Sequence, residues 1–166
     1  MVVAAEVAAV PGDELQALTE ELWEGIPLAA AAGITVTEAD DEHVRVSAPF
    51  QPNRNYHGTG FGGSIAIVGI VTGWIMVSRL LHMVEDAHEV VIQASSVDYL
   101  EPARDDLAGR ALSPPPPEIE RFVRTYQRFG RARIAVTSTI ESGDVTVARH
   151  EGTYAALRLP TAEAAP

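Results

Sequence analysis

The chain has 166 residues, a formal net charge of −11 and a hydrophobic content of 46%. This length suits one globular domain with a sizeable core, and the acidic balance disfavours nonspecific binding to nucleic acid or anionic membranes, because Lys and Arg supply phosphate affinity. The chain has no cysteine, which excludes disulfides, thiolate metal sites and cysteine nucleophiles. No basic or long apolar leader precedes Pro11, so we expect a cytoplasmic protein.

The N-terminal third predicts one amphipathic helix followed by two strands. Residues 1–12 are expected to form a flexible terminus, and Asp13 is expected to cap a helix that reaches about Glu24. Residues 26–28 then lead into a strand at 33–38. A second strand follows at 43–50, where apolar and polar residues alternate and predict one buried face and one wetter face.

The middle of the chain is dominated by residues 64–85, which are apolar nearly all round. A helix of this kind either spans a membrane or lies at the centre of a fold. Arg79 and His82 interrupt its second half. We therefore favour a buried central helix.

The C-terminal half predicts four strands and one further helix. The strands are expected at 89–100, 106–112, 131–141 and 145–157, with the helix at 118–129. Gly143-Asp144 predicts a tight hairpin turn, and Pro114 to Pro117 indicate a stiff connector rather than a polyproline ligand. Strands joined by hairpins around one apolar helix predict an α+β fold with an antiparallel sheet, in a single domain at 13–159 before a flexible C-terminus at 160–166.

The loop at 52–64 is the stretch that points most directly to chemistry. It reads Pro-Asn-Arg-Asn-Tyr-His-Gly-Thr-Gly-Phe-Gly-Gly-Ser, and its last residues open the central helix. A helix N-terminus offers unpaired N–H groups and a partial positive charge, which suit an oxyanion or a phosphate. The loop matches neither the P-loop nor the dinucleotide-binding pattern.

This loop resembles that of hotdog-fold thioesterases related to the C-terminal domain of YiiD. The later run Val-Ile-Gln-x-Ser-x-Val-x-Tyr-Leu-x-Pro at 91–102 adds to the likeness, which covers about residues 26–157. The resemblance implies a long central helix wrapped by a curved antiparallel sheet. It also implies a homodimer paired edge to edge, with the acyl tunnel and active site at the subunit interface; further pairing into a higher oligomer stays open.

The resemblance also implies roles for particular residues. The start of the helix at Gly62, Gly63 and Ser64 would supply the N–H groups for the oxyanion. A strand of the partner chain would contribute Gln93, Ser95 and Tyr99 to the substrate site, and the remaining substrate contacts are expected from loop residues Asn53, Tyr56, Gly58 and Phe61.

One departure concerns the catalytic carboxylate. Many hotdog thioesterases carry Asp or Glu one to two turns past the Gly-Gly pair, but residues 68–72 here are Val, Gly, Ile, Val and Thr. His57 is the nearest titratable candidate for the base, with Asn55 able to hold water. No histidine pair has metal-ligand spacing, so we expect no metal and no cofactor beyond the carrier of the substrate.

Several of these residues also have a purely structural interpretation. His57 could be a surface residue, Tyr56 and Tyr99 could be packing aromatics, and Asn55, Ser64 and Ser95 could be capping or backbone-bonding groups. Five arginines lie close together at 121, 124, 128, 131 and 133. They form either a solvated surface or a phosphate clasp for coenzyme A or a carrier arm, in which Arg121, Arg124 and Arg128 are the candidates.

Three functions remain open from the sequence. The first is hydrolysis of an acyl-CoA or acyl-carrier-protein thioester in fatty-acid, polyketide or related secondary metabolism. The second is conjugate (Michael) addition of glycine or a similar amine to an α,β-unsaturated acyl thioester, coupled to hydrolysis that releases a β-amino acid. The third is a non-catalytic acyl-binding module.

Overall fold

The computed structural model describes residues 10–82, 84 and 88–160. The elements are, in chain order, α1 (Gly12–Gly25), α2 (Pro27–Ala31), β1 (Thr35–Ala39), β2 (His43–Ala48), α3 (Phe50–Asn53), α4 (Gly62–Leu80), β3 (His88–Tyr99), β4 (Leu107–Leu112), α5 (Pro116–Phe129), β5 (Arg131–Ser142) and β6 (Val145–Arg158). Most of the termini that we expected to be flexible, and the predicted end of the central helix near Glu85, lie outside the described residues.

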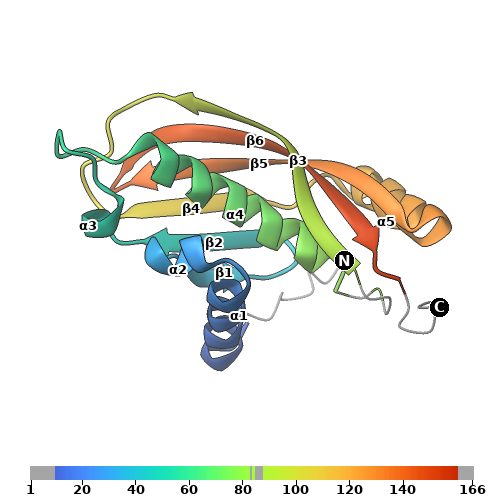
Figure 1. Ribbon diagram of the computed structural model, residues 1–166. Helices are drawn as coiled ribbons and strands as arrows, with labels where there is room; N and C mark the ends of the chain where they lie inside the picture. The colour runs from blue at the N-terminus through green and yellow to red at the C-terminus, as the bar shows by residue number, and fades with distance from the viewer. Residues whose placement is uncertain (1–9, 83, 85–87, 161–166) are drawn as a thin grey trace, which may run out of the picture.

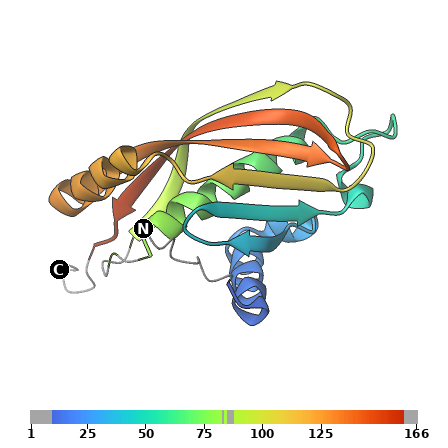
Figure 2. The ribbon, with the colours of Figure 1, turned by 180° about the vertical axis from the view of Figure 1, so that it is seen from behind.

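Six strands form one antiparallel sheet in the order β1-β2-β4-β5-β6-β3. The sheet curves around α4, which lies along its inner face and contacts every strand (Figure 1). Seen from behind, α4 lies beyond the strands and α5 extends from one end of the sheet (Figure 2). The predicted α+β fold with a central helix is confirmed.

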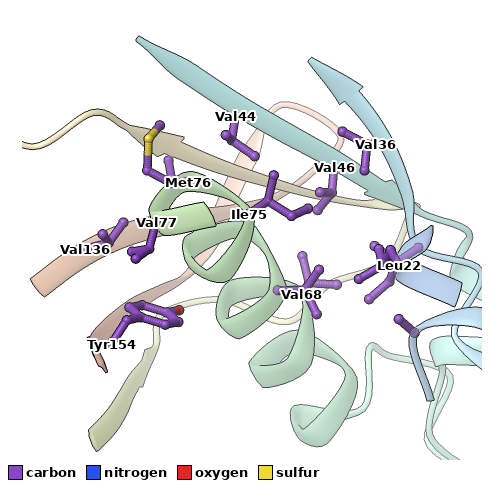
Figure 3. Close-up of a cluster of buried hydrophobic side chains, with 14 of the residues drawn as sticks. Leu22, Val36, Val44, Val46, Val68, Ile75, Met76, Val77, Val136 and Tyr154 are labelled. Carbon is purple, nitrogen blue, oxygen red and sulfur yellow. The ribbon is translucent and has the colours of Figure 1, made fainter. Parts of the chain in front are cut away.

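The core forms where α4 meets the sheet. Val68, Ile75 and Val77 of α4 are buried against side chains of the surrounding strands, among them Val46 and Tyr154 (Figure 3). Each fully buried side chain of this size stabilises the fold by about 1.5–3 kcal/mol. By length and composition α4 could cross a membrane, because its mean hydropathy is 1.6. However, half of this apolar stretch of α4 is buried inside the protein. The apolar character of α4 is thus accounted for by its central position.

Two local predictions near the N-terminus were wrong. Pro11, not Asp13, is the N-cap of α1, and Asp13 lies in the first turn, where its charge still favours the positive end of the helix. The segment expected to lead into a strand is the helix α2, which begins at Pro27. Proline suits that first position because its missing N–H would have no partner there. The predicted hairpin turn is confirmed, with Gly143 at a φ of +58°.

Candidate active site

The loop between α3 and α4 is organised by Asn55. The Asn55 Oδ1 atom accepts hydrogen bonds from the backbone N–H groups of His57 at 2.9 Å and Thr59 at 3.2 Å. Its Nδ2 group donates to Thr59 Oγ1 at 3.0 Å and to the Gly60 carbonyl at 3.3 Å. Both ends of the amide are therefore occupied within the loop, which favours the structural interpretation of Asn55 over a water-holding role.

His57 lies at the tip of this loop and is exposed. Its ring lies against that of Tyr56, with the centroids 3.9 Å apart and the ring planes tilted by 41°, and Tyr56 itself is 90% exposed. The loop projects outward beside the beginning of α4 (Figure 1). The two rings are thus presented to whatever approaches this end of the helix.

Asn53 has a structural role at the base of the loop. It is buried, and its Nδ2 group donates to the carbonyls of Ala32 at 2.7 Å and Pro49 at 2.8 Å. The backbone carbonyl of Asn53 accepts a hydrogen bond from the backbone N–H of Phe61 at 2.7 Å. Asn53 thereby fixes the residue from which α4 begins. Its side chain is directed into the fold and away from the exposed loop tip.

The N-terminus of α4 has the features expected of an oxyanion site. Its N-cap is Phe61, which makes no side-chain capping hydrogen bond within the described chain. The first helical hydrogen bond runs from the backbone N–H of Ile65 to the Phe61 carbonyl at 3.0 Å. The N–H groups of Gly62, Gly63 and Ser64 precede this bond and have no partner within the helix. A Cβ at Gly63 would lie 2.5 Å from the exposed Phe61 ring, so a side chain here would displace that ring.

Strand β3 lies along α4 from its first turn to its fourth. The Tyr99 hydroxyl donates to the Gly62 carbonyl at 2.9 Å, and the Trp74 Nε1 atom donates to the Val90 carbonyl at 2.9 Å. Tyr99 thus reaches the helix start of its own chain, whereas the resemblance assigned it to the partner's site. Because these two contacts lie at opposite ends of β3, helix and strand run antiparallel.

Between these contacts α4 shows a partly buried apolar stripe. Ile67, Ile70 and Trp74 recur at three- and four-residue spacing on one face and are only partly buried. The window 68–72, where related enzymes carry a carboxylate, faces mainly into the core. Ile70 is its one residue on the stripe. The stripe begins beside Gly63 and offers apolar surface next to the uncapped N–H groups.

A β-bulge divides the β3 residues that the sequence grouped together. The register shifts between Ile92 and Ala94, after which Ser95 pairs with Gly152 and Tyr99 with Ala148. Ser95 and Tyr99 therefore lie on the face that carries α4. Gln93, at the bulge, instead lines a groove of about 740 Å³ together with Thr125, Arg131 and Arg133, among other residues; we call these four residues the arginine groove.

The cluster of five arginines is thus divided between α5 and the arginine groove. Arg121, Arg124 and Arg128 lie exposed on α5, where the Arg128 guanidinium stands over the Phe129 ring at 5.0 Å. Arg131 and Arg133 belong to the arginine groove. The arginine groove is a more suitable phosphate site than the exposed face of α5, because two guanidinium groups in a groove can contact a phosphate from several sides.

One polar pair was missed from the sequence. Ser95 Oγ lies 3.0 Å from His150 Nε2; Ser95 is exposed on the edge strand, whereas His150 is fully buried. Burial lowers the pKa of His150 below its ordinary value, so that the ring is neutral at neutral pH. The available signal was the alternation of β6, which places His150 among inward-facing residues such as Tyr154.

Comparison with known proteins places this chain in a family. A family model described as "Putative thioesterase (yiiD_Cterm)" matches residues 15–158, so the chain belongs to that family and the predicted relationship is confirmed. No curated protein matches the sequence significantly.

Solved structures of similar shape agree with this assignment. A protein of unknown function from Chlorobaculum tepidum is 22% identical with a TM-score of 0.83, and the match covers 90% of this chain and 97% of that one. A "putative thioesterase" from Shewanella oneidensis is 26% identical with a TM-score of 0.76, over 89% and 99% of the two chains. A "probable thioesterase" from Pseudomonas aeruginosa shares the fold at 15% identity and a TM-score of 0.72, over 92% and 99%. Family and neighbours together support thioesterase-type activity.

Proposed function

We propose that this protein hydrolyses acyl thioesters carried on coenzyme A or an acyl carrier protein, and that it acts as a homodimer. The observation that carries the proposal is the uncapped start of α4 next to the apolar stripe of Ile67, Ile70 and Trp74. A thioester substrate has the matching parts, which are a carbonyl that becomes an oxyanion and an apolar acyl chain.

The start of α4 stabilises the charge that develops on the carbonyl oxygen. When a nucleophile attacks the thioester carbon, that oxygen becomes negative and accepts hydrogen bonds from the N–H groups of Gly63 and Ser64. One donor of this kind contributes about 2.7–4 kcal/mol to lowering the barrier. The acyl chain lies along the stripe, where its burial contributes about 0.8 kcal/mol for each CH₂.

A second copy of the chain encloses the stripe. Strand β3 pairs only with β6 within the described part of the chain, so one edge of a 12-residue strand is free. Val91, Tyr99 and Leu100 are 41%, 56% and 47% exposed. An open edge with exposed apolar side chains invites pairing with another strand, and pairing of β3 with its copy would place two α4 helices on the same side of a continuous sheet.

The base for the attacking water is His57, supplied by the exposed loop tip. A neutral imidazole accepts a proton from water as the water attacks the carbonyl, and it can return that proton to the departing thiolate. Active-site residues on loops above a rigid scaffold are common. The short, internally bonded loop around Asn55 holds His57 in a defined position.

A second reaction fits the same site because residues 68–72 contain no carboxylate. An amine such as glycine would attack the β-carbon of an α,β-unsaturated acyl thioester, His57 would take the proton from nitrogen, and the α-carbon would be protonated. Hydrolysis of the thioester would then release a β-amino acid. This chemistry needs a base for the amine but no carboxylate on the helix.

Turnover of crotonyl, octanoyl and palmitoyl thioesters, each with and without glycine, tests the proposal. Thiol release without glycine is expected for hydrolysis, and formation of a glycine adduct from the crotonyl substrate alone indicates the second reaction. Trp74→Ala should raise KM for the palmitoyl thioester more than for the crotonyl thioester, because Trp74 lies on the apolar stripe. Tight binding of all three substrates with no turnover would show a non-catalytic acyl-binding module instead.

A further inference from the structure

His150 and Ser95 form a contact between a buried base and an exposed hydroxyl. Ser95 Oγ is 3.0 Å from His150 Nε2, although the two residues are not directly opposite in the ladder. Ser95 pairs with Gly152, and His150 pairs with Val97. Both side chains therefore lie on the α4 face of the sheet, as diagonal neighbours two residues apart in register on adjacent strands.

Two glycines make room for the His150 ring. A Cβ at Gly69 of α4 would lie 2.7 Å from His150 Cβ, and one at Gly152 would lie 2.8 Å from His150 Cε1. Glycine in the interior of a helix costs about 1 kcal/mol relative to alanine, and glycine also weakens a strand. The fold accepts both costs beside His150, and the lack of a side chain at Gly152 also makes room for the Tyr154 ring, whose Cε2 atom would lie 2.6 Å from the added Cβ.

The polar groups around His150 are incompletely satisfied. Within the described chain, neither His150 Nδ1 nor Ser138 Oγ has a hydrogen-bond partner, and both are buried. Ser138 is directly opposite His150 in the β5–β6 ladder. An unpaired buried polar group costs about 1–3 kcal/mol and calls for an explanation other than core packing.

The pair also occupies the level of the missing carboxylate. His150 lies against Gly69, inside the window 68–72 in which the sequence lacks Asp and Glu. Ser95 is exposed on the edge strand, beside the apolar stripe and on the side where the acyl thioester is proposed to bind. A hydroxyl activated by an imidazole is a recognised alternative to a carboxylate for attack on an acyl group.

From this geometry we propose that Ser95 is the nucleophile of the proposed thioesterase and His150 its general base. Ser95 Oγ attacks the thioester carbon while its proton passes to His150 Nε2. The C–S bond then breaks, and the imidazolium returns the proton to the thiolate. An ester of Ser95 remains, which water cleaves into the free acid and Ser95. In this two-step reaction His57 activates water against the Ser95 ester instead of against the thioester: it takes a proton from the water and returns it to Ser95 Oγ as the C–O bond breaks.

This assignment rests on the proposed function, and it requires the homodimer to bring the start of the other protomer's α4 to the carbonyl, because Ser95 of the same chain lies at the level of Gly69 rather than Gly62. The charge state of His150 fits its role. On its face of β6 the nearby titratable side chain is Tyr154, whose pKa is raised by burial and whose hydroxyl donates to the Ile70 carbonyl at 2.8 Å. Arg149 and Glu151 alternate to the opposite face of the strand, so His150 is available as a neutral base.

Trapping of the acyl-enzyme tests the assignment. The full-length protein is mixed with octanoyl-CoA, quenched in acid within milliseconds and mapped by peptide mass spectrometry, while free thiol is followed in parallel. We expect a burst of thiol and an octanoyl ester on Ser95. Ser95→Ala should abolish the ester and lower kcat by about 10²–10⁴. Ser96→Ala is the matched control, because Ser96 lies on the same strand, pairs with Glu151 and points to the other face.

A second probe separates this assignment from the proposed function. A fluorophosphonate, which labels activated serines irrespective of the natural substrate, should modify Ser95 in the native protein and in the Ser96→Ala variant. His150→Asn should lose the label while keeping a cooperative thermal unfolding transition. Failure of every thioester with labelling at Ser95 intact would overturn the proposed function but retain the pair. Unchanged kcat in Ser95→Ala, or neither ester nor label on Ser95, would overturn the pair.

Discussion

The closeness of α4 to β6 makes Gly69→Ala a demanding test of the structure. A Cβ at this position would meet His150 Cβ at 2.7 Å, His150 Cγ at 2.9 Å and Ile140 Cδ1 at 3.2 Å, where ordinary contact begins at 3.4 Å. The first two atoms belong to the base of a buried ring and cannot swing aside. Either α4 must lift from the sheet or His150 must turn.

The expected magnitude follows from two opposing terms. Replacing glycine by alanine inside a helix gains about 1 kcal/mol, whereas overpacking a well-filled core costs about 1–3 kcal/mol. We expect a net loss of about 1 kcal/mol, which for a domain of this size lowers Tm by roughly 2–4 °C. The rate of acylation of Ser95 should fall by about tenfold or more, which is a larger effect than the small loss of stability. The reason is that a displacement of His150 by a fraction of an ångström disturbs its contact with Ser95.

Thermal unfolding and rapid-quench acylation measure the two effects separately. Gly25→Ala is the control, because this glycine is also helical and a Cβ there meets nothing within 4 Å. It should leave Tm unchanged or raise it, with normal acylation. A Gly69→Ala protein as stable and as active as the native one would refute the close packing of α4 on His150.

Three further outcomes are expected. Because burial lowers the pKa of His150 in the folded protein, the unfolded chain binds more protons below its own imidazole pKa of about 6.5; the unfolding free energy should therefore decrease as pH falls below that value, and His150→Asn should show a smaller decrease in chemical denaturation. His57→Ala should lower kcat by roughly 10²–10⁴ in steady-state assays while the octanoyl ester on Ser95 still forms and accumulates, and a normal kcat would remove His57 from the mechanism. Arg131 and Arg133 changed together to alanine should raise KM for a CoA thioester by about tenfold or more but leave an N-acetylcysteamine thioester unaffected, with Arg124→Ala as the comparison on α5; equal losses on both substrates would show that the arginine groove does not bind phosphate.

The sequence predicted the elements whose periodicity is strong and regular. The alternation in β2 follows from burial of one face of the strand, and the apolar character of α4 follows from its position along the inner face of the sheet. The glycine of the β5–β6 turn supplies a positive φ. The helix α2 was missed because its five residues are too few to show a period. Tertiary packing, including the hydrogen bond from Trp23 Nε1 to the Ile34 carbonyl at 2.6 Å, fixes that region.

The bulge in β3 shows why site residues are harder to predict than strands. Strict alternation would have placed Gln93 on the same face as Ser95 and Tyr99. One extra residue between Ile92 and Ala94 shifts the phase, so Gln93 lies in the arginine groove while Ser95 stays beside α4. No glycine marks the bulge, so nothing in the local sequence reveals it, although it decides which residues of β3 face α4.

His150 represents the opposite case, in which a signal was present but had a simpler interpretation. A histidine in the middle of a strand is usually solvent-facing, yet its neighbours two positions away, Ala148 and Gly152, share the inward phase with Tyr154. A titratable side chain in that phase must either be satisfied by the core or serve a reaction, since burial without partners is costly. The structure supplies Ser95 for one ring nitrogen, and within the described chain no partner for the other. The glycine-rich loop drew attention to His57, which is exposed and readily recognised. The His150 ring is instead accommodated by the fold, with Gly69 on one side and Gly152 on the other. This accommodation is the stronger argument for a catalytic role.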